Sequence, residues 1–367
     1  MERRPVAPHS RVDPSNGSQF SATTVCRLML RTTFGRVLRR LDRGLASVAG
    51  SDGRSTETLR AAATRLSALA IRVEPQDAWA HYRHGTNLRR SGRSVAALAA
   101  FQRATTLDPD ELAFAHRLEE SVQRTGTAAE HLPVARALAA DSPASWVAQR
   151  HLGHTLTALG DHDDASRAYR DAARVRLATQ PGLPTPSADD PPLEPGLVVI
   201  GARRCGKTTL FRQLCRHPSI TGALYEEIDF WSHQYDRGLE WYRSLFPPLP
   251  DTGEWLTGHT SARYLHHRDA AGRLIAALPD VRVVIMLRDP VDRAIADHHQ
   301  SQRLGREDRT FTEVIVDAIE RGVTCPTPVN LAFGSRTNLL EVIDRLADIA
   351  GQPLSLIHIS EPTRLLV

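Results

Sequence analysis

The chain has 367 residues, of which 41% are hydrophobic and 24% are charged, and its formal net charge is +4. This composition indicates a globular protein of two or three domains. The small excess of basic residues suits an anionic ligand but does not indicate nucleic-acid binding. No run approaches the ~20 apolar residues that a membrane helix needs. The N-terminus also lacks the apolar segment of a secretory signal.

The four cysteines are Cys26, Cys205, Cys215 and Cys325, and none of them forms a C-x-x-C pair. This spacing indicates neither a zinc site nor a disulfide scaffold. We therefore expect reduced thiols, a cytoplasmic protein and no metal ligands. Residues 1–43 are expected to form a basic, largely disordered tail, in which a helix can begin near Val25.

The first half of the chain contains an internal repeat. Six positions recur in order and with a constant offset: Gly85, Leu88, Gly92, Ala97, Phe101 and Ala104 return as Gly153, Leu156, Gly160, Ala165, Tyr169 and Ala172. Small residues at two of these positions let antiparallel helices approach closely, and the aromatic residue fills the groove to the next pair. Pro75, Pro109 and Pro143 follow one another at half of this offset and stop helices.

The interval between these prolines, about 34 residues, resembles the period of tetratricopeptide repeats. The resemblance implies an all-α solenoid of about four helix pairs over residues 44–178, with a concave face that can bind a protein or peptide partner. A plain helical bundle is the alternative. Residues 179–196 carry six prolines among small and acidic residues, so we expect a linker there.

Residues 197–353 are expected to form an α/β domain with a central parallel sheet. The apolar runs 197–200 and 281–287 predict buried strands, and each is followed by a helical segment. In such sheets ligands bind at the carboxyl ends of the strands. Both the turn after residue 200 and Arg288 fall at such an end.

The turn from Gly201 to Thr208 reads GARRCGKT and fits the pattern G-x-x-x-x-G-K-[ST] at every position. A strand, a glycine-containing turn and a helix together form a phosphate cradle, because backbone N–H groups and the helix N-terminus point into the turn. The simplest interpretation of this motif alone is a P-loop that binds ATP or GTP.

Four ordered segments resemble the sulfotransferase family that uses 3′-phosphoadenosine 5′-phosphosulfate (PAPS), and the heparan-sulfate-type and bacterial members most of all. The first segment resembles the family's 5′-phosphosulfate loop, and the last resembles its 3′-phosphate strand and loop. In chain order the segments are residues 200–210 with 217–218, residues 225–231 with 237–242 and 245–247, residues 258–265, and residues 287–294.

The resemblance implies a role for each matching residue. Glu227 matches the general base that takes the proton of the acceptor, and Arg204 matches the loop cation that neutralises the bridging oxygen. Arg288 matches the arginine that pairs with the 3′-phosphate. The expected donor-binding set is Arg204, Cys205, Gly206, Lys207, Thr208, Thr209, Arg288 and Ala296. The resemblance thus implies a sulfotransferase that moves sulfate from PAPS to a hydroxyl or amine of a glycan or small molecule.

The chain departs from the family pattern at several positions. Lys207 replaces the first loop threonine, Ala296 replaces a serine that holds the 3′-phosphate, and His259 and Ala262 replace a glutamate and a proline. Residues 354–367 resemble a translated sequencing adapter. We therefore expect a non-native tail and a C-terminally truncated transferase domain.

Two other functions remain open from the sequence. A P-loop kinase or NTPase explains the complete motif, but it needs an acidic residue for Mg²⁺ after a second strand. Here Arg288 comes first and Asp289 follows. A non-catalytic scaffold, in which the repeats bind a partner and the transferase domain is inert, is the third possibility.

Overall fold

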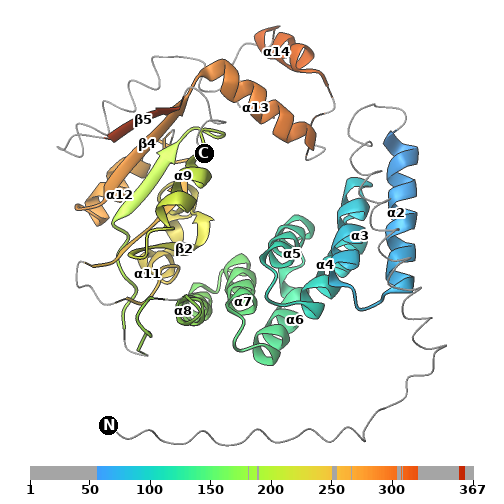
Figure 1. Ribbon diagram of the computed structural model, residues 1–367, viewed down its shortest axis with the longest axis horizontal. Coiled ribbons are helices and arrows are strands. Elements are labelled where there is room, and N and C mark those ends of the chain that lie inside the picture. The colour runs from blue at the N-terminus through green and yellow to red at the C-terminus, as the bar shows by residue number, and fades with distance from the viewer. Residues whose placement is uncertain are drawn as a thin grey trace, which may run out of the picture.

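The computed structural model describes residues 56–180, 182–187, 190–249, 254–265, 267–303, 307, 309–320 and 355–359. A helical array comes first and an α/β unit with a parallel sheet follows, as the sequence predicts (Figure 1). The predicted N-terminal tail lies outside the described residues.

The helical array repeats at a constant interval. Its helices are α2 (Thr56–Val73), α3 (Ala78–Arg90), α4 (Ser94–Leu107), α5 (Leu112–Thr125), α6 (Ala128–Asp141), α7 (Trp146–Ala158) and α8 (His162–Ala178). Helices α3, α5 and α7 begin at equal spacings along the chain, and α4, α6 and α8 begin at the same spacing, which equals the interval between the prolines. The described residues thus contain three pairs preceded by α2. The partner of α2 in the expected fourth pair falls before residue 56, outside the described part.

Close approach within a pair depends on glycine, as the repeat predicts. A Cβ atom on Gly85 would lie 2.8 Å from the ring of Phe101, and one on Gly153 would lie 2.6 Å from the ring of Tyr169. Each aromatic ring of a second helix therefore rests on the bare backbone of the first. Helix α4 ends two residues before Pro109, because proline cannot continue a helix.

The α/β unit is built on a five-stranded sheet in the order β2-β3-β1-β4-β5, with every pairing parallel. Its strands are β1 (Leu197–Gly201), β2 (Ile220–Glu227), β3 (Leu256–Ser261), β4 (Arg282–Arg288) and β5 (Ser355–Ile359). Its helices are α9 (Lys207–Leu214), α10 (Phe230–His233), η1 (Tyr235–Arg237), α11 (Leu239–Arg243), α12 (Ala270–Ala277), α13 (Pro290–Arg303) and α14 (Phe311–Glu320).

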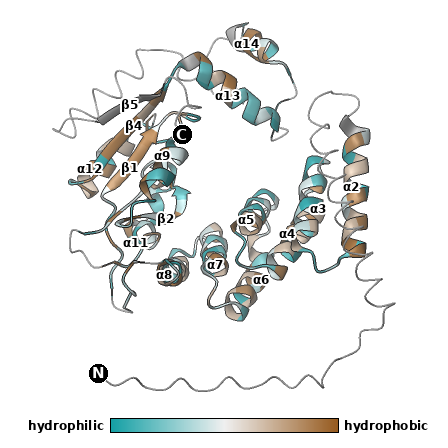
Figure 2. Ribbon diagram, viewed as in Figure 1, coloured by the Kyte–Doolittle hydropathy of each residue, from teal (hydrophilic) through white to brown (hydrophobic). Residues whose placement is uncertain are grey.

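Strand β1 lies at the centre of this sheet and is buried on both faces. Val198 and Ile200 belong to one apolar cluster, whereas Leu197 and Val199 belong to another that packs under Phe211 of α9. Alternating side chains on a strand point to opposite faces, so a continuous apolar run marks a strand covered on both sides. Figure 2 shows β1 and β4 as brown, apolar strands.

Residues 355–359 lie within the tail that we expect to be non-native. They form the edge strand β5, which pairs in parallel with β4 and places Ser355 opposite Val284. The prediction of a non-native tail remains a prediction. Residues 321–354, which precede this strand, lie outside the described part.

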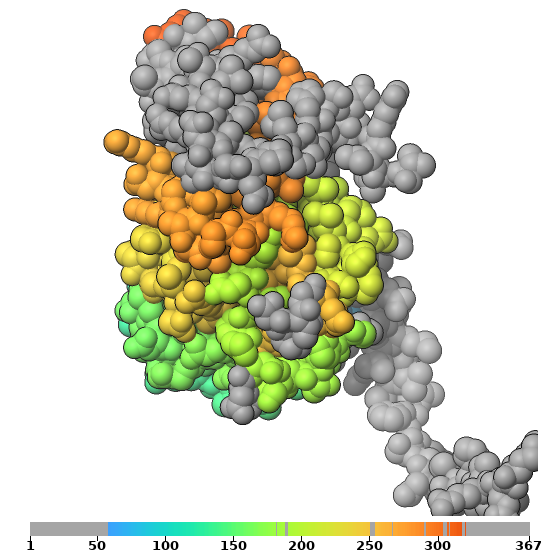
Figure 3. Space-filling view, turned by 90° about the vertical axis from the view of Figure 1, so that its left-hand side faces the viewer, coloured from blue at the N-terminus to red at the C-terminus, as the bar shows by residue number. Residues whose placement is uncertain are grey.

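The helical array and the α/β unit share one apolar core. The cluster around Tyr169 of α8 continues into Trp241 of α11 and Phe230 of α10. The rings of Tyr169 and Trp241 meet edge to face with centroids 6.0 Å apart. The indole N–H of Trp241 donates a hydrogen bond to Thr157 Oγ1 at 2.9 Å. In Figure 3 the green atoms of the array lie directly against the yellow atoms of the α/β unit.

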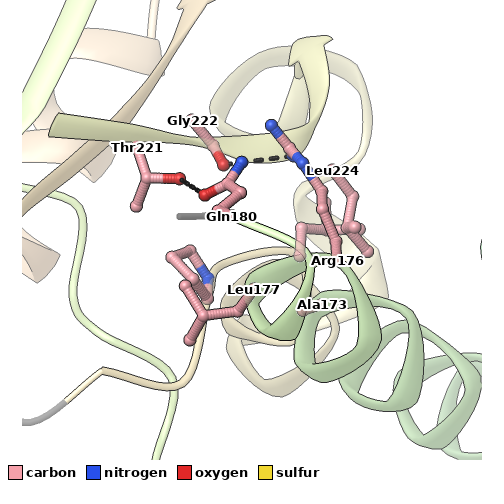
Figure 4. Close-up of a pocket in the computed structure, with 9 residues that line it drawn as sticks. Ala173, Arg176, Leu177, Gln180, Thr221, Gly222 and Leu224 are labelled. Atoms are coloured by element: carbon pink, nitrogen blue, oxygen red, sulfur yellow. Dashed lines mark hydrogen bonds between the residues drawn. The ribbon is translucent and has the colours of Figure 1, made fainter. Parts of the chain in front are cut away.

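Helix α8 also covers the edge strand β2. The Arg176 guanidinium donates hydrogen bonds to the carbonyls of Ala223 at 2.6 Å and Gly222 at 3.3 Å, and the Thr221 hydroxyl donates to Gln180 Oε1 (Figure 4). The small cavity between α8 and β2 has room for little more than a water molecule. A sheet edge presents unpaired backbone groups, and here side chains of the array satisfy them.

His259 of β3 is a buried polar residue inside this core. It is fully buried and shares a hydrogen bond of 3.0 Å with the hydroxyl of Tyr242. Burial lowers the pKa of His259 to about 4, because the charged imidazolium loses its hydration. Burial similarly lowers the pKa of His131, in the helical array, to about 4.

We expect Tyr169→Ala to lower the free energy of unfolding by about 3–5 kcal/mol, because it removes a buried ring from the shared core. It should also raise amide hydrogen exchange in β2 and α11. The matched control is Phe101→Ala, which removes the ring at the same repeat position but touches only the array. Equal exchange in β2 for the two variants, measured by mass spectrometry, would contradict the shared core.

Stability should fall as the pH drops from about 6.5 to 4. The native state keeps His259 neutral down to a pKa of about 4, whereas the unfolded state takes up a proton at its ordinary pKa. The unfolded state therefore gains up to about 3 kcal/mol from this residue. Urea unfolding of His259→Gln at pH 7 and pH 4.5 should show a shallower decline than the unsubstituted protein. The control is His299→Gln on the exposed surface, whose decline should match the unsubstituted protein.

Candidate active site

The carboxyl ends of four parallel strands meet at one edge of the sheet, and each end supplies a candidate residue. Strand β1 leads into the turn 201–207, β2 ends at Glu227, β3 ends at Ser261, and β4 ends at Arg288. Because all of these strands run in the same direction, residues far apart in the sequence gather along this edge.

The turn after β1 has the backbone geometry of a phosphate cradle. Gly201 and Gly206 have φ angles of 143° and 85°, and Arg204 has a φ of 66°. A left-handed conformation at a non-glycine residue is strained and occurs mainly at functional sites. Gly206 is the N-cap of α9, and Lys207, Thr208 and Thr209 open that helix. The first N–H groups of a helix have no intrahelical partner, so this turn presents donors for an anion.

Lys207 lies inside the turn. Its side chain is 5% exposed, and its Nζ donates a hydrogen bond of 3.0 Å to the carbonyl of Ala202. The same Nζ lies 4.0 Å from Glu227 Oε1. Burial lowers the pKa of Lys207, because the ammonium loses hydration. The structure thus places Lys207 beside Glu227, although the two residues are well separated in the sequence.

Glu227 is the last residue of β2 and lies at this edge of the sheet. The register between β2 and β3 shifts before it, so that Glu227 pairs with Thr260. The N–H of Ile228 donates to the carbonyl of Thr260 at 3.1 Å and fixes the end of β2. The carboxylate is 56% exposed. A molecule approaching from solvent can therefore reach it.

Arg288 reaches the turn from β4. Its Nη1 donates a hydrogen bond of 3.1 Å to the carbonyl of Arg204. Its Nε is buried and has no hydrogen-bond partner among the described residues. A buried donor without a partner is costly. An anionic oxygen beside this guanidinium would satisfy it, so the residues present fit a phosphate group.

Helix α13 carries a charged cluster against the same turn. Asp297 is buried, and its Oδ1 lies 3.5 Å from Arg204 Nε and 3.8 Å from Arg203 Nε. Arg293 is also buried and interacts electrostatically with Asp297. Ala296 lies on α13 directly before Asp297. Arg293 and Asp297 are not among the site residues predicted from the sequence, although their i,i+4 spacing on a helix after Arg288 places them on one helix face.

A second polar group lies beside Glu227. The Ser261 hydroxyl donates to Asp229 Oδ1 at 2.9 Å, and Arg263 Nε lies 3.0 Å from Asp229 Oδ2. These contacts join the ends of β2 and β3. Asp229 is not among the site residues predicted from the sequence.

Cys205 lies in the turn and is buried. Burial raises the pKa of its thiol, because a thiolate would lose its hydration. The thiol therefore remains protonated at neutral pH. Cys205 can contribute to the turn through its backbone N–H, and a thiolate is not expected there.

Comparison with known proteins places a family match on this unit. A family model described as a sulfotransferase domain matches residues 194–331. Human heparan sulfate glucosamine 3-O-sulfotransferase 6 is 36% identical over 130 residues, which cover 35% of this chain and 37% of the relative. Mouse bifunctional heparan sulfate N-deacetylase/N-sulfotransferase 4 is 36% identical over 116 residues, which cover 30% and 13%. The chain thus spans about a third or less of the length of these relatives.

A crystal structure of a sulfotransferase from Alicyclobacillus acidocaldarius is 28% identical, with a TM-score of 0.39, over 45% of this chain and 73% of that one. In the described residues, no helix is both long and apolar enough to cross a membrane. The residues that match the sulfotransferase-domain model thus include Lys207, Glu227 and Arg288 of the α/β unit.

Proposed function

We propose that the chain transfers a sulfuryl group from PAPS to a hydroxyl or amine of a glycan acceptor. The observation that carries this proposal is the contact between Arg288 and the turn. A guanidinium with a buried, unpartnered Nε stands beside a ring of backbone donors. A donor with phosphate groups at both ends of its nucleoside matches this pair of anion sites.

The donor would be held at two places, one in the turn and one at the end of β4. The N–H groups of residues 204–209 would hold the 5′-phosphosulfate, and Arg288 would hold the 3′-phosphate. Arg203, Arg204 and Arg293 place positive charge around the buried carboxylate of Asp297. We expect this charge to help hold the donor where Ala296 supplies no hydroxyl.

Glu227 is the proposed general base. Its carboxylate is exposed, adjoins the turn and lies 4.0 Å from the ammonium of Lys207. It can accept the proton of an acceptor hydroxyl or amine as the acceptor attacks sulfur. Positioning, charge neutralisation and one proton transfer are together sufficient for in-line transfer.

A P-loop NTPase is the second candidate, because Lys207 completes the motif and lies inside the turn. The acidic residue after β4 argues against it. Asp289 Oδ1 accepts hydrogen bonds from the N–H groups of Val291 at 2.9 Å and Asp292 at 3.1 Å. Its carboxylate thus caps α13, whereas an NTPase would use an acidic residue at this place to hold Mg²⁺.

The proposed acceptor surface is the cluster on α3 and α5 that consists of Arg89, Arg117, Glu120 and Arg124. The three guanidiniums lie 3.0, 2.6 and 3.8 Å from the one carboxylate, so this cluster carries an excess of positive charge. Tyr82 and Trp79 of α3 provide aromatic rings close by. Anionic groups of an acceptor would complement this charge.

Helix α7 lies between this cluster and the strand that ends at Glu227. Figure 1 shows α5 and α7 on the side of the array that faces α9 and α13, with α6 on the far side. Arg150 of α7 lies over the ring of Tyr225 at 4.5 Å, and Tyr225 precedes Glu227 by two residues on β2. An acceptor held on the first helices of the pairs would therefore extend toward the proposed base.

The protein should bind PAPS more tightly than ATP in calorimetry. Glu227→Gln should leave the Kd for PAPS within about twofold, because Glu227 contacts the acceptor. It should lower transfer of radiolabelled sulfate to heparan-sulfate oligosaccharides by about 10²–10⁴-fold. Tighter binding of ATP than of PAPS, together with Mg²⁺-dependent hydrolysis, would instead support the NTPase.

Arg288→Ala is the matched control for donor binding. It should weaken PAPS by about 10- to 100-fold, because it removes the charged partner of the 3′-phosphate. It should leave adenosine 5′-phosphosulfate, which lacks that phosphate, nearly unaffected. An equal loss of affinity for both nucleotides would show that Arg288 does not bind the 3′-phosphate.

Arg124→Glu should raise the KM for an anionic oligosaccharide acceptor by about tenfold with little change in kcat, because it reverses a charge of the acceptor surface but leaves the chemistry intact. The control is Arg103→Glu, which reverses an exposed charge on α4. A similar rise in KM for both variants would show that net charge, and not this surface, binds the acceptor.

A further inference from the structure

Two cations of the turn, Arg204 and Lys207, contact different partners. The Arg204 guanidinium lies against Asp297 of α13, with its Nε 3.5 Å from Oδ1. The carbonyl of Arg204 accepts the hydrogen bond from Arg288. Both contacts join Arg204 to the β4–α13 side of the site, where the proposed 3′-phosphate pocket lies.

Lys207 faces the other side of the turn. Its ammonium folds back under the turn to the carbonyl of Ala202 and stands 4.0 Å from the carboxylate of Glu227. An ammonium has three N–H donors arranged around a compact charge, so it can hold these two groups and one anionic oxygen at once. Such an oxygen would lie between the backbone donors of the turn and the proposed base.

Sulfuryl transfer needs a cation at that position. The bond between sulfur and the bridging oxygen of the donor breaks, and a bond between sulfur and the acceptor oxygen or nitrogen forms. The acceptor proton passes to Glu227, and the electron pair of the broken bond stays on the bridging oxygen, which becomes a terminal phosphate oxygen of 3′,5′-adenosine bisphosphate (PAP). The cation that lowers the barrier is the one beside this oxygen.

We propose that Lys207, and not Arg204, neutralises the charge that develops on the bridging oxygen. This assignment rests on the proposed sulfotransferase function and reassigns the role that the resemblance gives to Arg204. Arg204 instead holds α13 through Asp297. In this assignment the catalytic cation is the first residue of α9 and not the residue in the middle of the turn.

The test compares PAPS with PAP, because the bridging oxygen carries little charge in PAPS and a full share of charge in PAP. A cation matched to the developing charge binds the product group more strongly than the substrate group. Lys207→Met keeps the length of the apolar stem and removes the charge. It should raise the Kd for PAP by about 10- to 100-fold, as measured by calorimetry. It should also raise the Kd for PAPS, but by a factor that is several times smaller.

Arg204→Met is the matched control, since it removes the cation of the same turn to which the resemblance gives this role. It should change the two dissociation constants by the same factor, so that their ratio stays as in the unsubstituted protein. A changed ratio in Arg204→Met with an unchanged ratio in Lys207→Met would overturn the proposal. Circular dichroism checks that each variant is folded.

The side chain of Arg204 is 33% exposed, so its replacement should leave the fold intact. If neither Lys207→Met nor Lys207→Gln folds, Arg204→Met decides alone. An unchanged ratio supports Lys207, and a changed ratio overturns it. An unsubstituted protein that binds neither nucleotide would refute the proposed function itself, and the assignment of Lys207 with it.

Discussion

The site depends on one constraint, which is the parallel pairing of β1 with β3 on one side and with β4 on the other. This pairing aligns the carboxyl ends of the strands, so the turn after β1 lies between Glu227 and Arg288. The hydrogen bond from Arg288 to the carbonyl of Arg204 then connects β4 with the turn across a long stretch of sequence. The sheet therefore sets the distance between the two proposed anion sites, and loops alone could not hold it as firmly.

The helical array is part of this framework, because its last pair completes the core of the α/β unit. Tyr169 serves two functions at once: it fills the groove over Gly153 within its own pair and packs against Trp241 across the junction. Arg176 satisfies carbonyls at the edge of β2, the strand that ends at Glu227. Anything that shifts α8 must therefore also disturb the strand that carries the proposed base.

Much of this architecture is predictable from the sequence because local patterns encode it. The glycine–aromatic pairs and the spaced prolines predict the helix pairs, and the motif after an apolar run predicts the turn. Contacts between distant elements are not encoded in this way. The position of Asp297 under Arg204, the proximity of Lys207 to Glu227 and the packing of Trp241 on Tyr169 all depend on how the elements pack. A motif assigns a residue to the turn, but only packing decides where its side chain points.

The choice of residue at position 207 is informative in this light. Among the 46 lysines and arginines of the chain, Lys207 is the one lysine. Elsewhere the chain uses guanidinium groups, which bind carboxylates and phosphates through a planar fork. Inside the turn, the space between the carbonyl of Ala202 and the carboxylate of Glu227 suits a compact charge with donors in several directions. The use of lysine at this one position of an otherwise arginine-only chain is consistent with the role proposed for Lys207, because a single developing charge on one oxygen is best matched by a compact cation.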